Sequence, residues 1–273
     1  MNTQIARLSD RALVSVIGPD ADEWLQGLVT QTVTGLGPGE VRHAAFLTPQ
    51  GRLVADFIVQ RTPDGLLLDV AAAERDSLVG RLSLYRLRAK VEVSAIAGEV
   101  HAGWGGGDPV ASAAWDPRLA ALGWRRLGGD APLTVNATLE DYTRHRRSLG
   151  VAETSADGLA DRLYAIEANF DLLNGIDFRK GCFIGQETTS RMKRRNGVRS
   201  RILPFAGAGA CPGDEVLNGD LRAGEVLAAD VDGGLALMRL DRCKGELSVS
   251  GRALALAPPL WLVLDAPPST GPV

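Results

Sequence analysis

Cysteine is scarce in this chain of 273 residues, which contains only three. Cys182, Cys211 and Cys243 are odd in number and widely spaced, which does not match a disulfide framework. A chain without structural disulfides fits a reducing compartment. We therefore expect three free thiols.

Metal-ligand and nucleotide-binding motifs are also missing. There is no Cys-x-x-Cys, and His43, His101 and His145 are scattered instead of being paired at helical spacing. The glycines of 103–107 lack the flanking strand and helix that a phosphate-binding loop requires. We expect no metal site and no dinucleotide site.

Long apolar runs are absent as well. The stretch 253–264 is short and is broken by Pro258-Pro259, so it cannot span a bilayer. The first residues, MNTQIARLSD, lack the apolar core of a signal peptide. A net charge of −3 and a pI near 5.7 argue against a protein that coats nucleic acid. These features predict a soluble, cytoplasmic protein with no membrane and no DNA partner.

Apolar periodicity predicts strands and helices in the first part of the chain. Short strands are expected at 14–17, 44–47 and 53–60, separated by turns rich in proline and glycine. Amphipathic helices are expected from 71 to about 87 and from 139 to 149. A further helix is expected to start near Asp157 or Asp161.

The pattern changes near residue 200. Beyond it, turn signals separate short apolar runs at intervals of about ten residues, which is typical of a compact antiparallel barrel. We expect an α+β domain over 1–200, a β-barrel over 201–265 and a mobile tail over 266–273. The glycine- and alanine-rich stretch 97–130 is expected to separate two subdomains, as a loop followed by a small α/β piece.

An octapeptide, Lys-Gly-Cys-Phe-Ile-Gly-Gln-Glu, starts at Lys180 and says the most about function. Cys182 lies between Gly181 and Gly185, which let the backbone approach a strand or a ligand closely. A thiol has a pKa of about 8.5, and the neighbouring cations Arg179 and Lys180 favour its thiolate. A presented, reactive cysteine is one interpretation. A small buried residue at the start of a core strand is the other.

The residues around the octapeptide predict a built loop. Upstream, Asn174-Gly175 favours a tight turn because both residue types tolerate positive φ. Gln186 and Glu187 are expected to fix the loop through hydrogen bonds. Arg191 lies one helical turn after Glu187, so the two side chains can meet.

The octapeptide resembles the signature of the YgfZ family, Lys-Gly-Cys-aromatic-x-Gly-Gln-Glu, and has every fixed position of it. That family consists of folate-binding relatives of the glycine-cleavage T-protein, an aminomethyltransferase, and supports iron–sulfur protein maturation. Segments 8–33, 44–59 and 139–153 also resemble T-protein-like folate domains, so the resemblance covers about residues 5–260 and is weakest at 97–130.

The resemblance implies both a fold and a function. The fold is a folate-binding α+β domain of two ferredoxin-like halves, followed by a small antiparallel β-barrel. The function is to assist iron–sulfur cluster assembly or repair, with support of tRNA modification. Tetrahydrofolate or a derivative is the implied cofactor, and iron–sulfur client or assembly proteins are the implied partners.

Six residues are candidates for the folate contact, one of which is Arg191 of the basic run described below. Tyr142 and Arg146 lie four apart on one helix face and can address one ligand, and the resemblance places Tyr142 against the pterin. Some family members have tryptophan where this chain has Arg11, which we expect to pair with a ligand carboxylate instead. Glu167 and Asn169 suit the amino and ring N–H groups of a pterin. Either can equally cap local structure.

A basic run follows the octapeptide and can bind carboxylates or phosphates. It consists of Arg191, Lys193, Arg194, Arg195, Arg199 and Arg201. The glutamate tail of a folate suits such a rim. RNA is a rival partner, although no interleaved aromatics are present to stack bases. A solvated surface turn is a third interpretation. A further pocket edge is conceivable at Gln26, Gly27 and Thr30, with helix packing as the alternative.

Three functions stay open on the sequence. The first is a folate-binding assembly factor with Cys182 and Lys180 as its reactive groups. The second is an aminomethyltransferase that uses tetrahydrofolate, and the third is another cysteine-dependent enzyme. The catalytic aspartate of the T-protein is expected soon after the third N-terminal strand, where Asp76 lies in a helix-like stretch. The T-protein pattern lacks the Lys-Gly-Cys motif, so we favour the assembly factor.

Overall fold

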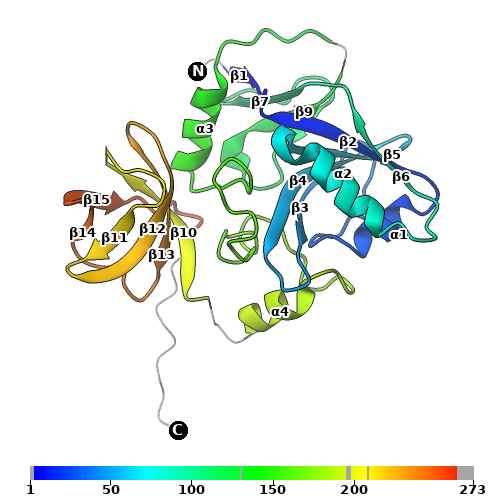
Figure 1. The fold of residues 1–273 in the computed structure, drawn as a ribbon. Helices are drawn as coiled ribbons and strands as arrows, with labels where there is room; N and C mark the ends of the chain where they lie inside the picture. Colours follow the sequence, from blue (N-terminus) through cyan, green and yellow to red (C-terminus); the bar gives the residue numbers. More distant parts are fainter. Residues whose placement is uncertain (1–2, 130, 195–197, 208, 263–273) are drawn as a thin grey trace.

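Two antiparallel sheets and a closed barrel organise the chain (Figure 1). The computed structural model describes residues 3–129, 131–194, 198–207 and 209–262, so the predicted tail over 266–273 lies outside the described residues. The predicted fold class, an α+β domain followed by an antiparallel barrel, is confirmed. No helix in the described part has both the length and the apolar composition to cross a bilayer.

The larger sheet has the strand order β3-β4-β5-β2-β6. Its members are β2 (Arg11–Ile17), β3 (Val41–Leu47), β4 (Leu53–Thr62), β5 (Gly65–Ala71) and β6 (Glu92–Ile96). Two helices, α1 (Ala21–Gln26) and α2 (Arg75–Leu84), pack their apolar side chains on this sheet. Leu25, Leu78 and Leu82 thereby enter one buried cluster with Val14 and Phe57 of the strands. This cluster is the first core of the molecule.

The smaller sheet has the order β1-β7-β9-β8, and three of its four strands lie in the segment 97–130, which was expected to separate two subdomains. Its members are β1 (Gln4–Arg7), β7 (Val100–Trp104), β8 (Ala113–Trp115) and β9 (Trp124–Leu127). Helix α3 (Leu139–Ser148) starts with a capping box between Thr138 and Asp141 and packs Tyr142 against Trp104. The expected α/β piece is therefore wrong: apart from a single 3₁₀ turn, its described residues are strand and loop.

A succession of turns replaces the helix expected near Asp157 or Asp161. Gly158, Asp161, Asn169 and Asn174 all adopt positive φ, between 55° and 68°, which a right-handed helix does not allow. The turns lead through the octapeptide into α4 (Gln186–Arg194). The octapeptide thus connects irregular backbone to a helix.

The barrel closes in the order β10-β13-β12-β11-β14-β15. Its members are β10 (Ser200–Ala206), β11 (Glu215–Asn218), β12 (Leu221–Ala229), β13 (Gly233–Arg239), β14 (Leu247–Val249) and β15 (Arg252–Leu256). Ile202, Leu227 and Leu235 of the barrel share a buried cluster with Phe170 and Phe183 of the preceding domain. The barrel is therefore packed onto that domain by a common core.

Candidate functional site

The thiol of Cys182 lies at the surface. Cys182 is exposed and free, and a Cβ placed on the adjacent Gly181 would meet nothing within 4 Å. The next two side chains point inward, since Phe183 is buried in the core shared with the barrel and Ile184 packs against the core under α1 and α2. The alternative of a buried cysteine starting a core strand is wrong. Two apolar anchors hold a loop that presents the sulfur to solvent.

Gly185 lets this loop sit against the turn between β3 and β4. Its φ is +79°, and a Cβ there would lie 2.6 Å from the carbonyl oxygen of Thr48 and 2.9 Å from the Cα of Gly51. Both distances are shorter than any real Cβ contact, so a side chain would force the backbones apart. The close approach predicted for the two glycines of the octapeptide holds for Gly185 and not for Gly181, which has open space around it.

Lys180 fastens the loop to the connection that follows α1. Its Nζ lies 2.7 Å, 2.6 Å and 3.0 Å from the carbonyl oxygens of Gln26, Val29 and Gln31. An ammonium group has three N–H donors, so all of them are used. Burial lowers the pKa of Lys180 to about 8, with Asp177 opposing the shift. The side chain therefore positions the loop, and its expected effect on the thiolate of Cys182 stays a prediction.

The Asn-Gly turn is anchored to the same connection. Asn174 has the predicted positive φ, 55°, and its carbonyl accepts from Gln31 Nε2 at 2.7 Å. The hydroxyl of Thr30 donates to the Gly175 carbonyl at 2.6 Å, and that of Thr32 donates to Asp177 at 2.7 Å. Thr30 was considered as a pocket edge, and it instead holds the cysteine loop in place.

Several cations before and after the octapeptide in the sequence are exposed. Arg179, Arg191, Arg194 and Arg199 are exposed, and none forms an ion pair within the described residues. Among the described residues the pairing expected between Arg191 and Glu187 is absent, and so are the side-chain hydrogen bonds by which Gln186 and Glu187 were expected to fix the loop. Glu187 and Gln186 instead form the first turn of α4.

The other cations of the basic run either pair with a carboxylate or lie outside the described residues. Arg201 and Lys193 share the carboxylate of Asp171, with N–O distances of 2.9 Å and 3.2 Å. Arg195 lies outside the described residues. The rim that faces solvent near Cys182 is thus smaller than the basic run suggests.

A buried network of charges fills the interior between the two sheets and α3. Its four guanidinium groups and four carboxylates belong to Arg11, Arg118, Arg125, Arg146, Asp69, Asp116, Glu153 and Asp157. Arg11 Nε lies 2.7 Å from Asp69, and Arg146 Nη1 lies 2.6 Å from Asp157. Burial favours the protonated acid, but Arg146 and Arg11 hold the pKa of Glu153 well below its usual range. The network is balanced and ionised.

Three of the residues assigned to tetrahydrofolate, Tyr142, Arg146 and Arg11, lie in this network and are bonded to protein groups instead of facing a ligand site. Tyr142 is 2% exposed, and its hydroxyl accepts from Arg118 and Arg125 at 3.1 Å and 2.6 Å. Arg146 and Arg11 are equally buried and are paired with carboxylates. Sequence reasoning placed Tyr142 and Arg146 on one helix face correctly, but that face points into the core.

The hollow beside Arg11 is too small for an intact folate. Its volume is about 260 Å³, and Asp10, Glu153 and Ser155 are among its lining residues. Sites for drug-sized ligands usually measure about 300–1,000 Å³. One carboxylate oxygen of Asp10 is buried without a hydrogen-bond partner in the described part, so this hollow suits a small donor such as an amine.

The remaining candidates hold the fold together. Glu167 accepts from the backbone N–H of Tyr164 at 3.0 Å, and burial raises its pKa. Asn169 donates to the carbonyl of Ile202 at 2.8 Å and thereby joins the turns to the barrel. Asp76 is exposed on α2 and pairs with Arg75 at 2.8 Å, which removes it as a catalytic aspartate.

Sequence reasoning missed a buried pair beneath the Asn-Gly turn. His43 Nε2 lies 3.6 Å from Asp56 Oδ2, and the other oxygen of Asp56 accepts from the Thr154 N–H at 2.6 Å. Although burial opposes it, the adjacent His43 and the charge of Arg11 lower the pKa of Asp56 to about 2. The signal that was available was Asp56, a single carboxylate within the otherwise apolar stretch 53–59.

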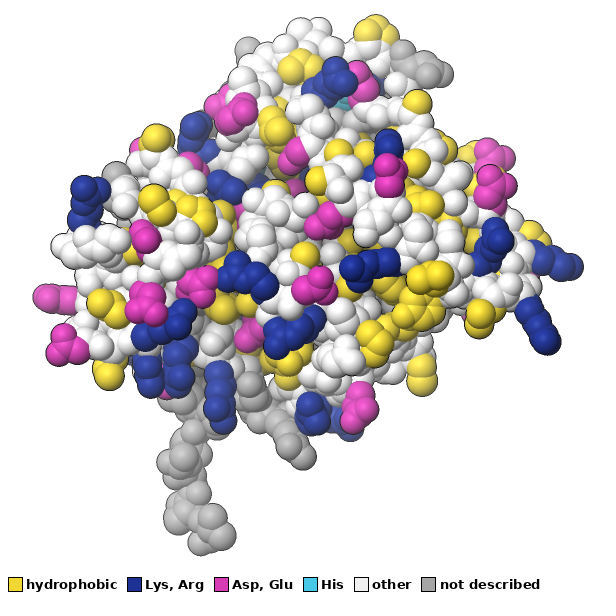
Figure 2. Space-filling view, in the orientation of Figure 1, with side chains coloured by type: hydrophobic (Ala, Val, Ile, Leu, Met, Phe, Trp, Pro, Cys, Tyr) yellow, Lys and Arg dark blue, Asp and Glu magenta, His cyan; other side chains and the backbone are white. Residues whose placement is uncertain are grey.

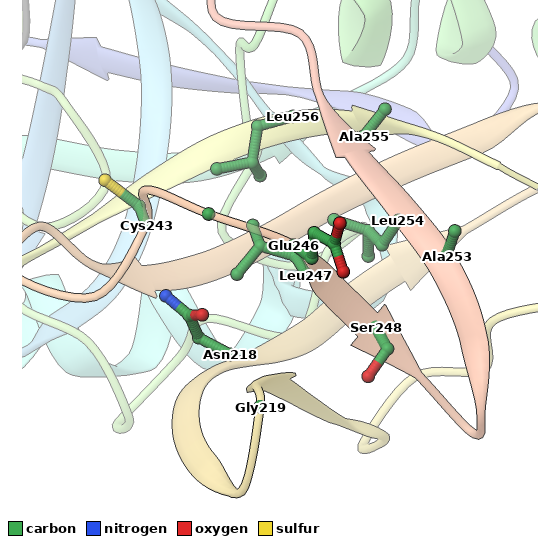
Figure 3. Close-up of a pocket in the computed structure, with 11 residues that line it drawn as sticks. Asn218, Gly219, Cys243, Glu246, Leu247, Ser248, Ala253, Leu254, Ala255 and Leu256 are labelled. Carbon is green, nitrogen blue, oxygen red and sulfur yellow. The ribbon is translucent and has the colours of Figure 1, made fainter.

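A second hollow, of about 1,000 Å³, lies on the barrel (Figure 3). Asn218, Cys243 and Ser248 are among its lining residues, and the octapeptide contributes none. The thiol of Cys243 donates to the carbonyl of Leu240 at 3.2 Å. No group of three or more His, Cys, Asp or Glu side chains in the described residues is arranged to hold a metal ion.

Two family models match the chain. The "GCVT N-terminal domain" matches residues 4–102, and "CAF17, C-terminal beta-barrel domain" matches residues 199–264. Among solved structures, the glycine cleavage system aminomethyltransferase T of Bartonella henselae is similar over 94% of this chain and 85% of its own, with a TM-score of 0.74. At 13% identity this likeness shows the fold alone.

Similar curated proteins are named mitochondrial iron–sulfur cluster assembly factor IBA57 or its homologue. The human protein is 31% identical over 304 residues, which cover 93% of this chain and 84% of its own. The mouse protein is 31% identical, with 89% and 79% covered, and the Neurospora crassa homologue is 34% identical, with 73% and 53% covered. The chain thus spans about half the length of its fungal relatives. Because these relatives are named as mitochondrial, the expected cytoplasmic location is wrong.

Proposed function

The chain belongs to the IBA57 family of iron–sulfur cluster assembly factors, and from this premise we propose that it helps to build or repair clusters through the thiol of Cys182. One observation carries the proposal: the sulfur is exposed on a loop that buried neighbours and Lys180 hold in place. Iron–sulfur clusters bind cysteine thiolates, so a fixed and accessible thiol is a suitable ligand. The thiol gives its proton to solvent and the thiolate binds iron.

Cys182 supplies one ligand of a cluster that a partner protein must share. A cluster usually needs four thiolate ligands. Cys211 and Cys243 belong to the barrel, and the described residues contain no set of ligands that could hold a metal ion alone. A cluster bound at Cys182 therefore takes its other ligands from another molecule. That molecule is a client or a carrier of the cluster.

The cationic rim favours such an encounter. Arg179 precedes Cys182 by three residues, and Arg191 and Arg194 lie on the helix that follows the loop. A cluster ligated by thiolates is anionic, and so is a protein surface rich in carboxylates. Cations around the thiol attract both and raise the rate of encounter.

Aminomethyl transfer is the weaker candidate. The likeness to an aminomethyltransferase concerns the fold, and Asp76, the aspartate weighed for catalysis, is exposed on α2 away from the buried network. Tetrahydrofolate binding stays a prediction of the resemblance, as does support of tRNA modification. Tyr142, Arg146 and Arg11 are buried in the charge network, and no step of the proposed function depends on tetrahydrofolate.

The decisive experiment is complementation in a strain of the source organism that lacks this gene. Wild type, Cys182→Ala, Cys182→Ser and the matched control Cys243→Ala are compared through the activity of an enzyme with a [4Fe–4S] cluster. We expect both position-182 variants to lose at least tenfold in restored activity and the control to restore it. Circular dichroism of the purified variants establishes that they fold. Full restoration by Cys182→Ala overturns the proposal.

A further inference from the structure

An exposed apolar and basic protrusion lies at the end of α2. Leu84 is 76% exposed, Leu87 is 90% exposed and Tyr85 is 38% exposed. The stretch 81–90, RLSLYRLRAK, carries four cations and no carboxylate. Arg81, Arg86, Arg88 and Lys90 are all exposed and form no ion pair within the described residues. We call residues 84–90 the α2 knob.

The α2 knob is a fixed feature of the fold. Backbone N–H groups of Tyr85, Arg86 and Ala89 donate to the carbonyls of Leu82, Ser83 and Arg86, at 3.0, 3.1 and 2.7 Å. Leu87 has φ +43°, a left-handed conformation that is strained for leucine. A strained, exposed leucine stabilises nothing within the monomer. Such positions are often retained for recognition.

The α2 knob is connected directly to the loop of Cys182 through α1. The indole N–H of Trp24 donates to the Tyr85 carbonyl at 3.1 Å, and two residues later the Gln26 carbonyl accepts from Lys180. The ring of Tyr85 also contacts that of Phe46 edge-on, with centroids 5.8 Å apart. Figure 2 shows hydrophobic side chains gathered on the face near the end of α2 and toward α4, with lysine and arginine around them.

The distance between these two features suits one interface. A standard protein interface buries about 800 Å² on each partner, a patch roughly 30 Å across. Helix α1 lies between the α2 knob and the cysteine loop, and its six residues span about 9 Å at about 1.5 Å per residue. One partner can therefore cover both. Leucine and tyrosine ringed by arginine are the kind of side chains that anchor protein interfaces.

We infer that the α2 knob is a docking site for the cluster-carrying partner, which presents an apolar pocket bordered by carboxylates. The inference rests on the proposed function and adds a second contact, distant from the thiol, that orients the partner. Charge complementarity sets the acidic border, because the four cations of 81–90 have no partner in the described part. The exposed side chains of Leu84 and Leu87 need an apolar pocket on the partner, because burying them there removes apolar surface from water. A lipid surface with anionic headgroups is the rival occupant.

The test uses photo-crosslinking in cells of the source organism. A benzoylphenylalanine is placed at Leu84 in one strain and at Arg191, beside the cysteine loop, in another. We expect the same protein to be captured from both positions. We also expect Arg86→Glu/Arg88→Glu to reduce capture from position 191 at least tenfold, while the control Arg252→Glu, an exposed arginine of the barrel, leaves it unchanged.

Three outcomes overturn the inference. Position 84 captures nothing, or a different protein, where position 191 gives a product. Leu84→Ser/Leu87→Ser restores cluster-enzyme activity as well as the control Leu221→Ser, an exposed leucine of β12. In the third outcome no protein is captured from position 84, and the wild-type protein sediments with phosphatidylglycerol vesicles while Arg86→Glu/Arg88→Glu does not. That result assigns the α2 knob to a lipid surface. Failure of the proposed function is a separate result, namely full activity of Cys182→Ala.

Discussion

A Cβ on Gly185 would lie 2.9 Å from the Cα of Gly51, so two glycines from distant parts of the chain touch through their backbones. This contact seats the start of α4 on the turn between β3 and β4. It thereby fixes the position of Cys182, three residues earlier in the chain.

Gly185→Ala should destabilise the protein. The new methyl group meets the Thr48 carbonyl, and alanine is strained at φ +79°. We expect the free energy of unfolding to fall by about 1–3 kcal/mol in urea denaturation. Gly181→Ala is the control, since its Cβ meets nothing within 4 Å. Equal stability of the two variants would contradict the close approach.

Lys180→Met should loosen the cysteine loop. The substitution leaves three carbonyls without their shared donor. We expect a loss of about 2–4 kcal/mol in the free energy of unfolding and faster proteolysis near 177–182. Lys193→Met, with a side chain 48% exposed, should cost less than about 1 kcal/mol. A protease pattern like that of wild type would count against the anchoring role of Lys180.

Glu153→Gln should be the most damaging of these changes. It leaves four buried guanidinium groups facing three carboxylates. Removing one member of a buried ion pair typically costs about 3–5 kcal/mol. The exposed pair between Glu99 and Arg7 provides the control, and Glu99→Gln should change stability by less than about 1 kcal/mol. Thermal unfolding of the two variants distinguishes them directly.

Acid should remove stability through Asp56. Its pKa is about 2 in the folded protein against an ordinary 3.8, so the unfolded chain binds more protons between these values. Stability from this group is complete above pH 3.8 and is lost as the pH falls through 2. It amounts to about 2 kcal/mol. Urea denaturation at several acidic pH values should therefore show a flatter pH dependence for Asp56→Asn than for wild type.

Tyr142 should contribute nothing to any binding of tetrahydrofolate, so Tyr142→Phe should leave the calorimetric titration of the protein with tetrahydrofolate unchanged. Tyr142 and Arg146 are buried and bonded to other groups, and the hollow beside Arg11 measures about 260 Å³. Saturable binding that Tyr142→Phe abolishes would restore these residues to a ligand site and refute our assignment of them to the core.

Local patterns in the sequence predicted much of the fold. Strands such as β3 and β4, the Asn-Gly turn and the regular turns of the barrel follow from apolar residues between turns and from residues that tolerate positive φ. These features depend on neighbours in sequence. The exposed thiol was one of two interpretations that the sequence left open, and the neighbouring glycines and cations were the reason for it.

Partners far apart in the sequence explain the failures. Arg125 is paired with Asp69, 56 residues away, and nothing nearby distinguishes it from a surface arginine. Lys180 donates to carbonyls about 150 residues earlier in the chain. Its closeness in sequence to Cys182 suggested a role in the chemistry of the thiol and gave no sign of this anchoring contact. A helix was expected to start near Asp157 or Asp161. Asp161 instead adopts a left-handed conformation, which a right-handed helix does not allow.

Phe183 follows the reactive cysteine and shares its hydrophobic cluster with Ile202, Leu227 and Leu235 of the barrel. Severing the chain before β10 would strip the cover from this phenylalanine and release the segment that carries the sulfur. The preceding domain therefore depends on the barrel for part of its buried core. Truncated versions made for crystallography or assays should keep both domains. Substitutions of buried barrel residues such as Leu227 can displace Cys182 although they do not contact it.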